Sequence, residues 1–171
     1  NDQPVHALVN NAGISPKQEN GDRLDTLTTD QSIWAEVLQV NLLAPALLTR
    51  RLTKSLQKGQ GAVVNVTSIA GTRVHRFAGP AYAASKAALS TLTRELASDL
   101  GNLGIRVNAV SPGEIKTEML SLATANEMIH DIPLHRLGDV EEVASAIYFL
   151  CCGSASYING AEIEINGGQH V

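Results

Sequence analysis

A tyrosine and a lysine lie four residues apart in the stretch PAYAASKAAL, residues 80–89. Alanine is the strongest helix former and proline fits the first turn of a helix, so this stretch predicts a helix that begins at about Ala81. A spacing of four places the Tyr82 phenol and the Lys86 ammonium on one helix face. A nearby ammonium favours the phenolate and lowers a tyrosine pKa from its usual value of about 10. The pair therefore predicts a general acid or base, beside small side chains that leave room for a ligand.

The elements that would position this pair form an alternation of strands and helices. Four apolar segments predict strands within residues 6–13, 61–68, 104–113 and 161–167, and helical patterns cover residues 28–57, 81–100 and 140–151. Asp139 and Glu142 have the spacing of a capping box at the start of the last helix. Residues 114–138 lack a clear period and predict a loop. The alternation indicates an α/β fold with a parallel sheet and right-handed crossovers.

Polar residues follow three of the predicted strands where each strand ends. They are the segments NNAG at 10–13, TS at 67–68 and SPG at 111–113. Ligands of open α/β sheets bind at the carboxyl ends of the strands, and Tyr82 and Lys86 begin the helix that follows the second of these segments. We therefore expect Ser68 and Tyr82 to share one site, with Ser68 donating a hydrogen bond to a substrate oxygen.

Pro45 interrupts the helical run QVNLLAPALLTR. Proline has no N–H, so it cannot donate to the carbonyl of Asn41 four residues earlier. A carbonyl without its helical partner needs another donor, for which an ordered water is suitable. This predicts a water at Asn41 that could extend a proton path from Lys86.

Together the motifs NNAG, YAASK and PGEIKT, with Asn41 and Ser68, resemble those of the classical short-chain dehydrogenase/reductases, and the likeness runs over residues 5–171. The resemblance implies a Rossmann-like, doubly wound parallel sheet in three α/β/α layers. It also implies an enzyme that uses NAD or NADP to move a hydride to or from a secondary alcohol or ketone. In such an enzyme Tyr82 is the catalytic acid/base, Ser68 orients the substrate oxygen, and Asn41 anchors the relay water.

The resemblance further implies which residues meet the cofactor. Lys86 would lower the pKa of Tyr82 and bind the nicotinamide ribose, so both residues belong to the cofactor site. The other implied contacts are Asn11 and Gly13 along the cofactor, Ile115 at the carboxamide through its backbone, and Thr117 at the phosphates.

One expected feature of that family is missing from the sequence. The 14 glycines nowhere form the glycine-rich turn that holds the cofactor pyrophosphate. We therefore expect residues 1–171 to be the carboxyl-terminal two-thirds of one domain whose native chain has roughly 250 residues. An alternative is a catalytically silent fragment that acts as an assembly or interaction module, which needs no glycine-rich segment. An epimerase or dehydratase of the extended branch would need a larger carboxyl-terminal domain.

Composition excludes several partners. The net charge is −4 and there is no basic run, so we expect no nucleic acid partner. We expect no apolar stretch to reach the roughly 18 residues of a membrane span, and therefore no membrane partner. The adjacent Cys151 and Cys152 form neither a structural disulfide nor a metal-ligand set, which predicts a cytoplasmic protein without a metal. The partners we expect are a small alcohol or ketone and further copies of the chain. By resemblance, the copies pair through the helices at 28–57 and 81–100 and form a tetramer or a dimer. His75, His130 and His135 show no metal-ligand spacing and are expected at the surface. An alternative for His75 is the substrate pocket, because it lies between Ser68 and Tyr82 in the sequence.

Overall fold

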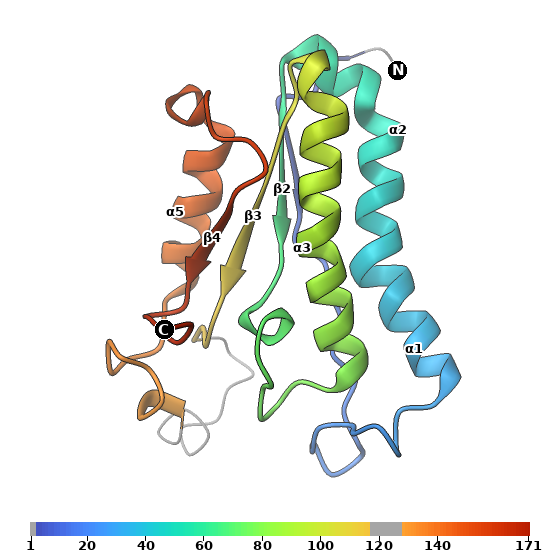
Figure 1. The fold of residues 1–171 in the computed structure, drawn as a ribbon, viewed down its shortest axis with the longest axis vertical. Helices are drawn as coiled ribbons and strands as arrows, with labels where there is room; N and C mark the ends of the chain where they lie inside the picture. The colour runs from blue at the N-terminus through green and yellow to red at the C-terminus, as the bar shows by residue number, and fades with distance from the viewer. Residues whose placement is uncertain (1–2, 117–127) are drawn as a thin grey trace.

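The computed structural model describes residues 3–116 and 128–171, and its centre is a parallel β-sheet (Figure 1). The sheet has four strands in the order β1-β2-β3-β4 within these residues. The strands are β1 (Ala7–Asn10), β2 (Ala62–Val66), β3 (Arg106–Pro112) and β4 (Glu162–Ile165). Every neighbouring pair is parallel. The predicted α/β fold with a parallel sheet is therefore confirmed.

The helices occupy the segments predicted for them, with ends that differ by a few residues. They are α1 (Gln31–Leu38), α2 (Ala44–Gly59), α3 (Pro80–Leu100) and α5 (Val140–Cys151). Short 3₁₀ turns follow β2, α3 and α5, namely η2 (Ile69–Gly71), η3 (Gly101–Leu103) and η4 (Gly153–Ala155). The capping box of Asp139 and Glu142 is present at the start of α5.

Helices cover both faces of the sheet and give the three layers of the fold (Figure 1). Successive strand residues point to opposite faces, so neighbouring valines of β2 belong to different clusters. The cluster beneath α2 and α3 consists of Leu56, Val63, Ala97, Ile105 and Val107. The cluster beneath α5 consists of Val64, Val66, Val110, Leu150 and Ala155. All five residues of β2 are buried, as expected of a strand covered on both sides.

The connections through α3 and α5 lie on opposite faces of the sheet. α3 joins β2 to β3 over the face of Val63, whereas α5 lies between β3 and β4 on the face of Val64. Because the order β2-β3-β4 runs in one direction, these two connections have opposite hands. The expectation that every crossover is right-handed is therefore wrong for one of them. The physical reason is that α5 covers the apolar face that α2 and α3 leave open.

A π-helical turn, η1 (Gln39–Leu43), joins α1 to α2. The N–H of Ala44 bonds to the carbonyl of Gln39, five residues back, directly before Pro45. Pro45 therefore disturbs the helix as predicted, and the ladder accommodates it by widening one turn. Within this turn Asn41 is fully buried.

The continuous helical segment Gln31–Gly59 has the length and apolar composition of a membrane-crossing helix. This corrects the expectation that no segment would reach that limit. A helix that packs in a protein core or interface meets the same criterion, and here α1 and η1 pack against α3 while Leu56 of α2 lies in the core.

Candidate active site

Tyr82 and Lys86 lie on the first two turns of α3 and face a cleft of about 750 Å³ at the carboxyl ends of the strands. Lys86 Nζ lies 5.6 Å from the centre of the Tyr82 ring. It also donates a hydrogen bond of 2.6 Å to the carbonyl of Val66, the last residue of β2. Lys86 is only 4% exposed, so its charge is held at one place beside the phenol.

Ser68 lies beside Tyr82 on the wall of the same cleft. It caps the turn η2, and its Oγ accepts a hydrogen bond of 3.2 Å from the N–H of Ala70. Both residues line this cleft, because the turn η2 that Ser68 caps packs closely against α3. Gly71 permits this approach, because a Cβ at that position would lie 2.8 Å from the backbone nitrogen of Ala87 on α3.

The pKa of Tyr82 departs from its ordinary value in the direction opposite to the one expected. Burial raises the pKa of the phenol most, the hydrogen bond to Ser68 lowers it, and the negative charge of Glu114 raises it. The expectation that Lys86 would lower this pKa is corrected, because removing the phenolate from water outweighs its favourable contacts. Burial also lowers the pKa of Lys86, to about 8.

The side chain of Asn41 connects three segments by hydrogen bonds: the turn η1, the loop after β1 and the helix α3. Its Oδ1 accepts a hydrogen bond of 2.8 Å from the N–H of Ile14, and its Nδ2 donates to the carbonyl of Ile14 and to Ser85 Oγ, both at 3.0 Å. Ser85 in turn donates to the carbonyl of Tyr82 at 2.7 Å. The side chain of Asn41 therefore links the loop after β1 to the first turn of α3. The sequence reasoning considered only its backbone carbonyl.

The residues expected to bind the cofactor have different positions relative to the cleft. Asn11 and Gly13 line it together with Lys86. A Cβ on Gly13 would lie 3.3 Å from Lys86 Nζ and 3.4 Å from Asn41 Oδ1, so a larger residue would crowd both groups. Ile115 forms a parallel bridge with Gly138, in which the N–H of Lys116 donates to Gly138 and the N–H of Gly138 donates to the carbonyl of Glu114. The N–H and C=O of Ile115 itself therefore point to the other side. Thr117 lies outside the described residues.

His75 and Glu114 also reach the cleft wall. His75 was a candidate from its place in the sequence, whereas Glu114 was not singled out, although it stands inside the motif PGEIKT. The signal that could have found it is its place directly after the polar end of β3, where ligands of such sheets bind.

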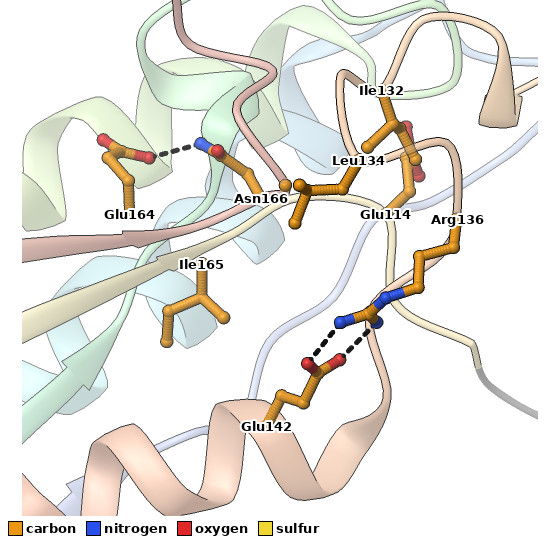
Figure 2. Close-up of a pocket in the computed structure, with 10 residues that line it drawn as sticks. Glu114, Ile132, Leu134, Arg136, Glu142, Glu164, Ile165 and Asn166 are labelled. Carbon is orange, nitrogen blue, oxygen red and sulfur yellow. Dashed lines mark hydrogen bonds and ion pairs between the residues drawn. The ribbon is translucent and has the colours of Figure 1, made fainter.

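A smaller pocket of about 160 Å³ lies next to this region, and Figure 2 shows Glu114 on its wall. Arg136 and Glu142 form a two-pronged ion pair there, with both N–O distances at 2.7 Å. Asn166 donates to Glu164 at 2.7 Å. In each pair the two side chains are hydrogen-bonded to each other, one pair at the start of α5 and the other at the end of β4. We therefore assign this pocket no part in the chemistry.

The sequence matches a family model and known proteins along most of its length. The family model described as enoyl-(acyl carrier protein) reductase matches residues 2–170. Protein FixR of Bradyrhizobium diazoefficiens is 57% identical over 168 residues, which are 98% of this chain and 60% of FixR.

Two solved structures have a similar fold. A short-chain dehydrogenase/reductase oxidoreductase from Brucella ovis has a TM-score of 0.80 and 55% identity, over 95% of this chain and 69% of that one. A 3-oxoacyl-[acyl-carrier protein] reductase with bound NAD from Brucella melitensis has a TM-score of 0.90 and 34% identity, over 96% of this chain and 62% of that one. The chain thus spans between 60% and 69% of the length of these three proteins. A family match along nearly the whole chain, with relatives of this identity, establishes that the chain belongs to the classical short-chain dehydrogenase/reductase family.

Proposed function

We propose that the protein is an NAD(P)-dependent oxidoreductase that moves a hydride between the nicotinamide and a secondary alcohol or ketone. The observation that carries this proposal is the meeting of Ser68, Tyr82 and Lys86 on one cleft wall, with the lysine buried beside the phenol. The NAD bound by the Brucella melitensis reductase supports the choice of cofactor.

The residues around the cleft fit a nicotinamide nucleotide. Gly13 keeps the space in front of Lys86 and Asn41 free of a side chain, and Asn11 lies on the same wall. When bound there, the nucleotide would supply or accept the hydride. Lys86 would donate a hydrogen bond to a ribose hydroxyl, and the backbone N–H and C=O of Ile115 would meet the carboxamide. We assign Thr117 to the phosphates by resemblance alone.

Proton transfer is assigned to Tyr82. In alcohol oxidation its Oη takes the hydroxyl proton, and in ketone reduction it returns that proton to the carbonyl oxygen. Ser68 donates a hydrogen bond to the same substrate oxygen and stabilises the charge that develops on it. Lys86, held by Val66, places a positive charge beside the phenolate that forms. A water at the Asn41 carbonyl would connect this site to solvent.

The second candidate is a silent module that acts through assembly. The exposed leucines of the η1–α2 surface favour a self-association surface: Leu43 is 46%, Leu47 is 53% and Leu48 is 48% exposed. We propose that this surface forms a homo-oligomer interface in the active enzyme, so that the two functions are compatible. A Leu47→Asp variant of the full-length protein should be smaller by light scattering than the wild type. Unchanged mass would place the interface elsewhere.

We also propose a cytoplasmic location, because Cys151 and Cys152 are free thiols.

The proposal is tested with the full-length protein and a Ser68→Ala variant. We expect nucleotide binding to remain and kcat for ketone reduction to fall roughly 100- to 1,000-fold, because a donor to the reacting oxygen is lost. Ser145→Ala, on the exposed side of α5, is the matched control and should keep full turnover. Binding of NAD(H) and NADP(H) without turnover of any alcohol or ketone would favour the silent module.

A further inference from the structure

His75 and Glu114 form a polar pair on the cleft wall. Nε2 of His75 lies 2.6 Å from Oε1 of Glu114, and the two side chains are only 18% and 14% exposed. Both residues also line an adjoining hollow of about 40 Å³, to which neither Gly13 nor Lys86 contributes among the described residues. The pair therefore lies toward the end of the cleft away from Gly13 and Lys86, and Glu114 directly precedes Ile115.

The hydrogen bonds around His75 fix the position of its ring proton. The N–H of Phe77 donates to Nδ1 at 3.2 Å, so Nδ1 carries no proton and Nε2 donates to Glu114. Two cations bind the backbone of this loop: Arg23 donates to the carbonyl of His75 at 3.3 Å, and Lys17 donates to the carbonyl of Phe77. A neutral imidazole on a braced loop thus orients the carboxylate of Glu114.

Only one oxygen of this carboxylate is engaged. Oε1 accepts from His75, whereas Oε2 has no hydrogen-bond partner within residues 3–116 and 128–171. A carboxylate only accepts hydrogen bonds, so Oε2 can accept one from a donor in the cleft. Glu114 and Tyr82 line the same cleft, and the charge of Glu114 raises the pKa of the phenol.

Resting on the proposed function, we propose that Glu114, oriented by His75, accepts a hydrogen bond from a second hydroxyl of the substrate. The substrate class is then a neutral vicinal diol or polyol, or the matching hydroxyketone. An anionic group at this place would be repelled by Glu114, and a hydrocarbon would leave the carboxylate unpaired. A cationic substrate would meet Lys17 and Lys86, which line the same cleft.

The test measures binding without turnover. It uses the full-length protein carrying Tyr82→Phe, which keeps the cleft but lacks the acid/base, with and without NAD⁺ or NADP⁺. The two ligands are 2,3-butanediol and 2-butanol, which share a carbon skeleton and differ by one hydroxyl. Ligand-observed NMR titration gives the Kd of each. We expect the diol to bind about 10- to 100-fold more tightly, as a charge-assisted hydrogen bond predicts.

Substitution of Glu114 should remove this preference. In Glu114→Ala the two Kd values should agree within about twofold, and Glu114→Gln should retain only part of the difference, because its amide is a neutral acceptor. Glu141→Gln, on the exposed surface of α5, is the matched control and should keep the full preference. Using two Glu114 variants keeps the test valid if one of them fails to fold.

Three results would overturn the inference: equal binding of the diol and 2-butanol, a preference that survives Glu114→Ala, or tighter binding of 3-amino-2-butanol than of the diol. Turnover by the protein with Tyr82 intact is a separate readout. Diol-selective binding without turnover would reject the proposed function and leave this inference standing. Turnover without diol-selective binding would reject this inference and leave the proposed function standing.

Discussion

Gly71→Ala should separate the two elements that bring the catalytic groups together. Gly71 ends the turn that Ser68 caps, and a Cβ there would lie 2.8 Å from the nitrogen of Ala87, next to Lys86 on α3. Ordinary contact begins at 3.4 Å, so the turn and the helix must move apart by about 0.6 Å. The atoms that Cβ would meet are backbone, and a side-chain rotation cannot relieve the clash.

The expected loss has two parts. Overpacking of this kind costs about 1–3 kcal/mol of unfolding free energy, and a misplacement of this size at reacting groups costs roughly 10- to 100-fold in kcat/KM. Both are measured on the full-length protein, by the urea midpoint and by initial rates. Gly153→Ala is the matched control, because Gly153 also lies in a 3₁₀ turn and a Cβ there meets nothing within 4 Å. If Gly71→Ala and Gly153→Ala had the same midpoint and the same rate, the close approach of η2 to α3 would be refuted.

Two further predictions concern buried polar groups. Asn41→Ala removes three side-chain hydrogen bonds to Ile14 and Ser85, so the urea midpoint should report a loss of about 2–4 kcal/mol, against nearly none for the exposed Asn20→Ala; a loss below about 1 kcal/mol would contradict the bridging role. The pKa of Lys86 falls from 10.5 to about 8 on folding, so between these pH values the unfolded chain binds more protons and stability rises with pH. The stability of the wild type relative to Lys86→Met should therefore increase from pH 8 to pH 10.5, and a flat difference would count against burial of the charge.

Sequence reasoning placed the short-range part of the site correctly. A helical spacing fixes which face Tyr82 and Lys86 share, and the carboxyl ends of parallel strands meet at one edge, which brings Ser68 near them. The roles of these residues stay predictions, as do those of Asn11, Gly13 and Ile115.

The rest of the site depends on contacts between segments far apart in the sequence. The bridge of Asn41 to Ser85 spans 44 positions and the pair of His75 and Glu114 spans 39, and no local pattern encodes either contact. The direction of the Tyr82 pKa was wrong for the same reason, because burial is a property of the assembled cleft. The π-turn was also missed, because a proline shows where a helix is disturbed and not how the ladder adapts.

The central claim is that Tyr82 transfers the proton, and Tyr82→Phe tests it most directly. The measurement is stopped-flow oxidation of bound NADH or NADPH by the full-length variant with a ketone it reduces, beside Tyr157→Phe as the fully exposed control. The account predicts that the variant loses at least about 100-fold in the rate of hydride transfer, while its urea midpoint matches that of the control. A rate within about tenfold of the control would contradict it and place the acid/base on another residue.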